Sequence, residues 1–406
     1  MNDIAESYVK LVLALGQRDP GYVDAYYGPP QWKSEVERST PELAGISRTA
    51  ADLISEIASQ PPSSDEMDSL RAQYLSRQLQ ALEARVDILQ GKKMSFDEES
   101  QALYDAVAPT HPDSYFQTVL DKLDKELPGK GSLAQRYEDF RKSFIIPPDR
   151  LDAVYTAAIA ECRSRTKQHI DLPQGENFRV EYVTDKPWSA YNWYQGNYQS
   201  LIQVNTELPI SIDRAIDLAC HEGYPGHHVY NTLLEEHLVN ERGWKEFSVY
   251  PLFSPQSLIA EGSANYGIHV AFPGDERVIY EKTKLFPIAG IDPSRADRYY
   301  RVQGLVDQLS YAGNEAARRY LNGEIDASQA AQWLTRYALS DPKRAEQRVR
   351  FFDTYRSYVI NYNLGKDLVR KYIESRGGTT ANPDKRWDEF EKLLSSPRLP
   401  SGLKVH

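Results

Sequence analysis

Three of the chain's eight histidines lie within residues 221–228, which read His-Glu-Gly-Tyr-Pro-Gly-His-His. The neutral imidazole nitrogens of histidine bind zinc well, and a neighbouring carboxylate can accept a proton from an attacking water. Zinc hydrolases carry these residue types as His-Glu-x-x-His on one helix. The segment therefore predicts a metal ion held by His221 and a second histidine, with Glu222 as the general base and acid of a hydrolysis.

The spacing leaves the second histidine open between two residues. In a regular helix each residue turns by about 100° and rises about 1.5 Å, so His227 would lie on another face than His221, and His228 about 10 Å further along. Pro225 excludes a regular helix, because it lacks an N–H and its ring clashes with the carbonyl of residue 221. A bulge at Pro225-Gly226 would bring His227 to the usual position of the second histidine. We predict His227 as the ligand and keep His228 as the alternate.

A third ligand is expected in the segment 257–266, Ser-Leu-Ile-Ala-Glu-Gly-Ser-Ala-Asn-Tyr. Its single carboxylate, Glu261, lies among small and apolar residues and needs a partner to keep its charge. Two histidines and one glutamate complete a three-ligand catalytic zinc site with one open position. Asn265, one turn after Glu261, is expected to hydrogen-bond a ligand and orient it.

The elements that position these residues are mostly helices. The sequence predicts helices over 3–18, 42–60, 65–91, 97–106, 112–126, 132–144 and 149–169, and again from 212 onward. Residues 178–183 and 200–205 are strand candidates immediately before the histidine motif. We predict a mainly α protein of two lobes around a central cleft, with a small β-sheet beside the metal-binding helix. The Pro147-Pro148 pair suggests lobes of residues 1–146 and 147–406, unless the chain is one continuous domain.

Composition narrows the partners and the location. The net charge of −10 and the pI near 5.4 argue against nucleic acid or an anionic membrane, since both favour a basic face. No stretch approaches the ~20 apolar residues that span a bilayer. Cys162 and Cys220 allow one disulfide at most, which is not the framework of a small secreted protein. The cytoplasm is the default location, and the oligomeric state stays open.

The two motifs together resemble those of the bacterial family known as domain of unknown function 885, which is related to the gluzincin zinc metallopeptidases. The resemblance rests on His-Glu-x-x-Pro-Gly-His at 221–227 and Glu-Gly-x-Ala-x-Tyr at 261–266, and it extends over residues 178–372. It implies zinc held by His221, His227 and Glu261, with Glu222 as the base. It also implies a mostly helical fold with a deep cleft, and a small sheet whose edge strand lies beside the substrate.

The same resemblance suggests where a substrate would lie. Residues 198–205 would form the edge strand and pair with an extended peptide, which makes Tyr198, Gln203 and Asn205 candidate substrate-binding residues. A plain sheet strand is the alternative for this segment. The chain is shorter than members of the family usually are, so the N-terminal lobe that would roof the cleft is expected to be reduced.

A tyrosine is expected to hold the developing oxyanion. The run Tyr-Asn-Leu-Gly at 362–365 resembles a Tyr-x-x-Gly signature near the family's C-terminus, which favours Tyr362. The rivals in this tyrosine-rich chain are Tyr311, Tyr355 and Tyr358. Asn265 stands where many gluzincins have an aspartate, which leaves the three metal ligands unchanged.

These residues predict a zinc-dependent peptidase with one zinc ion per chain. Two alternatives remain. The same site could hydrolyse a non-peptide amide or a modified amino acid, so that the substrate is a peptide or a small amide. The chain could also be a non-catalytic helical binding protein, in which the histidines hold a structural metal or none. Substrate length and the preference for either end of a peptide are not determined by the sequence.

Overall fold

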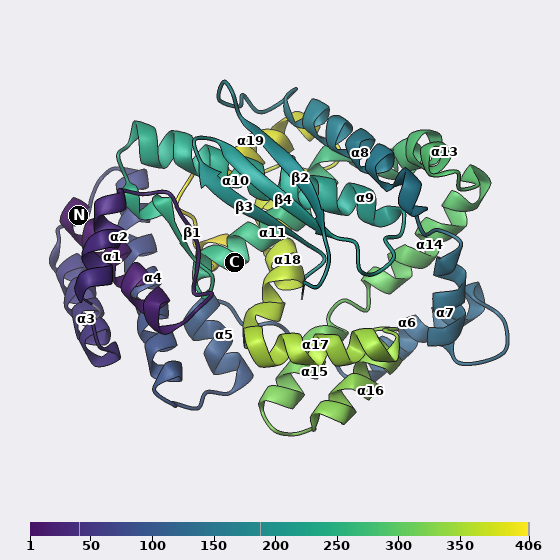
Figure 1. Ribbon diagram of the computed structural model, residues 1–406, viewed down its shortest axis with the longest axis horizontal. Coiled ribbons are helices and arrows are strands. Elements are labelled where there is room, and N and C mark those ends of the chain that lie inside the picture. Colours follow the sequence, from purple (N-terminus) through teal and green to yellow (C-terminus); the bar gives the residue numbers. More distant parts are fainter. Residues whose placement is uncertain (40, 187, 405–406) are drawn as a thin grey trace.

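The computed structural model describes residues 1–39, 41–186 and 188–404, and they form a mainly helical protein with two small sheets (Figure 1). The predicted fold class is confirmed. Within these residues, no helix combines the length and the apolar character needed to cross a bilayer.

The N-terminal helices agree with the predicted ranges to within a few residues. They are α1 (Asn2–Arg18), α3 (Leu43–Ser59), α4 (Glu66–Leu89), α5 (Phe96–Tyr104), α6 (Asp113–Glu126), α7 (Leu133–Lys142) and α8 (Leu151–Thr166). Local signals set their ends, as in α5, where Ser95 and Glu98 form a reciprocal capping box. Strand β1 (Val23–Tyr26) and helix α2 (Pro30–Ser39) were not predicted.

The rest of the chain holds the larger sheet and the central helices. Its strands are β2 (Asn177–Val183), β3 (Ala190–Gly196), β4 (Gln199–Asn205) and β5 (Val249–Pro251). Its longer helices are α9 (Asp213–Leu218), α10 (His227–Leu233), α11 (Pro255–Ala271), α12 (Glu276–Tyr280), α14 (Ala296–Asp307), α15 (Ala312–Leu321), α16 (Ala327–Tyr337), α17 (Pro342–Tyr355), α18 (Ile360–Ser375) and α19 (Pro383–Leu394). A π-helical turn, η2 (Ala219–Gly223), follows α9, and a short 3₁₀ turn, η7 (Arg356–Val359), joins α17 to α18.

The larger sheet has the strand order β2-β4-β3, with β4 parallel to β2 and antiparallel to β3. Strand β4 alternates, with Ser200, Ile202 and Val204 buried. The prediction that residues 198–205 form an edge strand is therefore wrong. Both edges of β4 are already hydrogen-bonded, so its backbone has no free side to which a peptide can add. The edge strands are β2 and β3.

Helix α11 lies at the centre of the molecule, with α18 beside it (Figure 1), and the two helices touch at glycines. A Cβ atom added to Gly262 would lie 2.4 Å from the carbonyl carbon of Gly365, and one added to Gly365 would lie 2.7 Å from the backbone oxygen of Leu258. Only glycine permits this approach. It brings Tyr358 on η7 and Tyr362 on α18 close to Glu261 on α11.

The two predicted lobes share structure. Strand β1 pairs antiparallel with β5, and the main hydrophobic cluster contains buried residues from α1 through to α19. Arg71 on α4 forms a buried ion pair with Glu246, beside β5. The division into residues 1–146 and 147–406 stays a prediction.

Cys162 on α8 and Cys220 on η2 form a disulfide, and both are fully buried. The bridge joins α8 to the turn that carries His221. The sequence left this pairing open, since a separation of 58 residues says nothing of proximity.

A buried carboxylate, Glu176, ties the histidine segment to the sheet. It accepts hydrogen bonds from Arg163 (2.6 Å), the Tyr224 hydroxyl (2.6 Å) and His228 Nε2 (3.1 Å). The Ser200 hydroxyl lies 2.8 Å from His228 Nδ1. Burial raises the pKa of Glu176, but the three donors outweigh it and lower the pKa to about 2.

We expect Glu176→Gln to destabilise the protein at neutral pH by ~1.5–3 kcal/mol, the usual contribution of a hydrogen bond to a charged group. The folded pKa of Glu176 lies below the ordinary value of ~4.3, so its stabilisation is complete above that value and is lost as the pH falls toward 2. Denaturant unfolding of both proteins between pH 7 and pH 2.5 should show the difference shrinking with acid. Glu37→Gln, at an exposed position, is the control. A difference that stays constant with pH would contradict the role of the charge.

Candidate metal centre

The backbone breaks between the two motif histidines. The π-helical turn η2 ends at Gly223, the Tyr224–Pro225 peptide bond is cis, and α10 begins at His227. A Cβ atom on Gly226 would lie 1.9 Å from the carbonyl oxygen of residue 221, so no other residue fits there. The interruption predicted at Pro225-Gly226 is confirmed, and it turns His227 back toward the preceding helix.

The structure brings His221, His227 and Glu261 together. The two Nε2 atoms lie 3.1 Å apart, and Glu261 Oε2 lies 3.3 Å from His221 Nε2 and 3.8 Å from His227 Nε2. Three ligands at ~2.0–2.2 Å from one ion in tetrahedral geometry would be ~3.3–3.6 Å apart. Within residues 1–39, 41–186 and 188–404, this is the one group of histidine, cysteine and acidic side chains arranged to hold a metal ion.

The hydrogen bonds of Asn265 fix which nitrogen of His221 is free. The Asn265 amide nitrogen donates to the backbone oxygen of Tyr362 (3.0 Å), so its oxygen must accept. That oxygen lies 3.0 Å from His221 Nδ1, which therefore carries the proton. A neutral His221 then points the lone pair of Nε2 at Glu261 and His227, as a metal ligand does. Asn265 thus makes the orienting contact predicted for it.

Glu261 is held from the other side by a tyrosine. The Tyr358 hydroxyl donates to Glu261 Oε1 (2.8 Å), while the buried Oε2 has no hydrogen-bond donor. Burial raises the pKa of Glu261, but the neighbouring His221 and His227 outweigh it and lower the pKa. Burial lowers the pKa of His221, but Glu261 and the charge of Glu222 raise it to about 9. The three atoms thus form a place that favours a cation.

Glu222 lies next to this cluster and is free to act. It is buried and lines the main cleft, and its carboxylate makes no hydrogen bond or ion pair with the described residues. Its backbone oxygen accepts from the side chain of Asn192 on β3 (2.7 Å), which fixes the end of η2 against the sheet. This is the arrangement expected of a general base, which must have a free lone pair.

His228, the predicted alternate ligand, lies outside the group formed by His221, His227 and Glu261. Its ring is fully buried and turned toward the sheet, with Ser200 on one nitrogen and Glu176 on the other. Burial lowers the pKa of His228, so a neutral ring donates from Nε2 to Glu176 and accepts at Nδ1 from Ser200. The reason is rotational: α10 begins at His227, and consecutive residues point about 100° apart.

The tyrosines near the site separate into two groups. The Tyr358 hydroxyl is bonded to Glu261, and that of Tyr311 to Asp367, so neither is free for a substrate. Tyr362 and Tyr355 line the cleft with hydroxyls that make no hydrogen bond to the described residues. Burial, and then the charges of Glu261 and Glu222, raise the pKa of Tyr362, so its phenol stays protonated and can donate.

The predicted substrate-binding residues are mostly turned elsewhere. The Tyr198 hydroxyl accepts from Asn240, and the Gln203 side chain bonds to Trp193 and Glu181, on the far face of β4. Neither lines the cleft. Asn205 borders it, but its amide donates to the backbone oxygens of residues 186 and 188.

Strand β3 takes the place that was predicted for β4. Its residues Ala190, Tyr191, Asn192 and Tyr194 line the cleft, and its only strand partner among the described residues is β4. This aromatic stretch was not predicted to be a strand. Alternation of Tyr191 and Trp193 with polar residues was the available signal.

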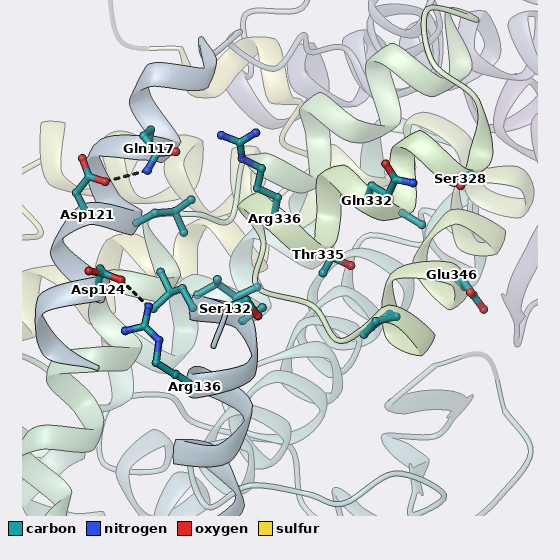
Figure 2. Close-up of a pocket in the computed structure, with 16 residues that line it drawn as sticks. Gln117, Asp121, Asp124, Ser132, Arg136, Ser328, Gln332, Thr335, Arg336 and Glu346 are labelled. Atoms are coloured by element: carbon teal, nitrogen blue, oxygen red, sulfur yellow. Dashed lines mark hydrogen bonds and ion pairs between the residues drawn. The ribbon is translucent and has the colours of Figure 1, made fainter. Parts of the chain in front are cut away.

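Two cavities stand out, and the candidate metal-binding group lies in the larger of the two. The main cleft has a volume of about 970 Å³ and is lined by His221, His227, Glu261 and Glu222. A second pocket of about 670 Å³ lies among α6, α7, α16 and α17 (Figure 2). It contains none of the predicted site residues. Several of its polar groups bond to each other, as the Asp124–Arg136 ion pair in Figure 2 shows.

Known proteins resemble this chain in fold but not in sequence. No family model matches the chain, and no curated protein does either. A protein from Colwellia psychrerythraea described as a lipoprotein is structurally similar, with a TM-score of 0.54 and 14% identity over 89% of this chain and 68% of that one. The structure of BsuCP gives a TM-score of 0.51 and 13% identity over 97% of this chain and 88% of that one. At such identities the likeness concerns the fold alone, and membership of the family that the motifs resemble stays a prediction.

Adjacent histidines offer a matched test of the metal centre. We expect wild-type protein to bind about one equivalent of zinc. His227→Ala should lose the metal with little change in fold. His228→Ala should keep the three ligands but lose ~1–3 kcal/mol of stability, because Glu176 and Ser200 lose a buried partner. Elemental analysis and thermal unfolding of the three proteins measure both effects. Metal lost from His228→Ala and retained by His227→Ala would contradict the assignment.

Proposed function

We propose that the protein is a zinc-dependent peptidase. The observation that carries the proposal is the convergence of two imidazole nitrogens and a carboxylate oxygen beside a free glutamate, in a cleft of about 970 Å³. His221, His227 and Glu261 would hold the ion. A zinc ion bound there would lower the pKa of water and polarise the scissile carbonyl.

The chain's own groups account for the proton transfers. Glu222 accepts a proton from the attacking water and then delivers it to the leaving amine. The protonated phenol of Tyr362 donates a hydrogen bond to the oxygen that gains charge. Asn265 and Tyr358 act through the ligands: Asn265 holds the tautomer of His221, and Tyr358 holds the orientation of Glu261.

A peptide would bind along the exposed edge of β3. Strand addition satisfies the backbone of an extended substrate without regard to its side chains, which suits peptides of varied sequence. Ala190, Tyr191 and Asn192 line the cleft on this edge. A small non-peptide amide remains the alternative substrate, since the same ligands and base would serve it.

A purely structural metal is disfavoured by the surroundings of the site. Structural zinc sites are closed by four protein ligands, often including cysteine. The nearest cysteine, Cys220, is bonded to Cys162, and the three ligands border an open cleft.

The test of the proposed function is Glu222→Gln. We expect peptide cleavage to fall by ~10²–10⁴-fold, the usual contribution of general acid–base catalysis, while zinc content stays near one equivalent. Glu241→Gln, at an exposed glutamate, is the control and should leave cleavage unchanged. Cleavage by Glu222→Gln at the wild-type rate would end the assignment of the base.

We also infer that the protein works in an oxidising compartment and not in the cytoplasm. The buried Cys162–Cys220 bridge supports this, because cytosolic thiols are kept reduced. Lysis of the native host in denaturant with an alkylating agent, which exposes buried thiols, followed by mass measurement of the chain, should find no label at either cysteine. Full labelling of both would restore the cytoplasmic location.

A further inference from the structure

The cations that line the main cleft are nearly all neutralised by acidic partners. Arg214 and Arg277 pair with Asp217, Arg344 pairs with Asp341, and Arg141 lies near Glu138. Lys366 makes no ion pair, but its charge lowers the pKa of nearby Asp307 against the effect of burial. Acidic side chains of the protein itself therefore balance the charges of these five cations.

Arg348 on α17 differs from all of these, because neither an ion pair nor a nearby acidic charge among the described residues acts on it. It lines the cleft, and within the described part of the chain its guanidinium makes no hydrogen bond and no ion pair. Its neighbours are rings: the guanidinium carbon lies 4.4 Å from the centre of Phe351, 5.7 Å from Phe352 and 6.0 Å from Tyr362. Burial lowers the pKa of Arg348, and Tyr362 is the only titrating neighbour that opposes the effect.

An arginine without an acidic partner is not explained by the stability of the fold. The Arg348 side chain is half-buried, so it loses part of its hydration, and an acidic partner normally offsets that cost. Contact with ring faces offsets part of the cost and leaves the N–H edge of the planar group unbonded. The carboxylates near the metal-binding group do not supply the partner. Burial, and then the charges of Glu261 and Glu222, raise the pKa of Asp24, and none of these three acidic groups acts appreciably on Arg348.

Tyr362 connects this cation to the metal centre. Its ring lies 6.0 Å from the guanidinium and 5.8 Å from the ring of Tyr358, whose hydroxyl bonds to Glu261. Arg348 is therefore two aromatic rings away from a metal ligand. A short stretch of extended substrate, at ~3.3–3.6 Å per residue, can follow such a path.

We propose that Arg348 binds the terminal carboxylate of the substrate, so that the enzyme removes residues from the C-terminal end of peptides. The inference rests on the proposed peptidase function and names its substrate class. The guanidinium fork matches a carboxylate with two parallel hydrogen bonds, and the partner it lacks in the free protein is then supplied by the substrate. An acidic side chain offers the same chemistry, but it occupies a given position in only a minority of peptides, whereas every unmodified peptide ends in a carboxylate.

The test uses N-acetylated tripeptides with neutral side chains, as free acids and as C-terminal amides. We expect wild-type kcat/KM to be ~10–10²-fold higher for the acid, the usual value of a charge-assisted hydrogen bond. Arg348→Gln should remove this preference, mainly through KM, and leave the amide unaffected. Arg348→Lys should restore part of it. Arg350→Gln, two residues away and exposed, is the matched control and should behave as wild type.

Three outcomes would overturn the proposal. Equal rates for acid and amide in the wild type would exclude a terminal-carboxylate site. An equal loss on both substrates in Arg348→Gln would make the arginine structural. An amide that ends in glutamate and is cleaved as fast as the acid would assign Arg348 to a side chain.

A binding measurement separates this proposal from the peptidase function. In Glu222→Gln, calorimetric affinity for the acid peptide should exceed that for the amide, and adding Arg348→Gln should abolish the difference. If wild-type protein cleaves none of these peptides but the difference in affinity persists, the peptidase function fails and the carboxylate site stands. If cleavage depends on Glu222 and the affinities are equal, only the carboxylate site fails.

Discussion

Two imidazole nitrogens and a carboxylate oxygen that meet in a buried place repel one another unless a cation lies among them. In this protein the three atoms are His221 Nε2, His227 Nε2 and Glu261 Oε2, at separations of 3.1, 3.3 and 3.8 Å. The surrounding hydrogen bonds orient the three groups toward one another. Asn265 accepts a hydrogen bond from Nδ1 of His221, and the Tyr358 hydroxyl donates one to Oε1 of Glu261. The contacts of Asn265 and Tyr358, as well as the three ligand atoms themselves, therefore favour a bound cation.

The backbone makes this convergence possible at two glycine positions. At Gly226 the chain passes so close to the carbonyl of residue 221 that no side chain fits, which lets α10 begin at His227. At Gly262 and Gly365 helices α11 and α18 touch through their backbones, which brings Tyr358 and Tyr362 beside Glu261. The buried contacts of Glu176 and the Cys162–Cys220 bridge then hold the broken helix against the sheet and α8.

Local patterns predicted much of this arrangement. The N-terminal helices, the choice of His227 and the place of Asn265 all follow from periodicity or from the backbone limits of proline and glycine, which act over a few residues. The sequence could favour His227 over His228, because two neighbouring residues of a helix must point in different directions. The role of β4 could not. A strand's own residues do not say whether both of its edges are paired, and the partner β3 was hidden in an aromatic stretch.

The sequence by itself determined which groups could hold a metal and where the chain must leave the helical path, because residue type and proline geometry are local properties. Only the tertiary structure decided that Tyr358 anchors Glu261 whereas Tyr362 stays free, that Cys162 reaches Cys220, and that Arg348 faces the cleft without an acidic partner. Each of those facts depends on which segments lie side by side. Contacts between distant segments are set by packing and charge balance across the whole molecule, and no short stretch of the chain contains them.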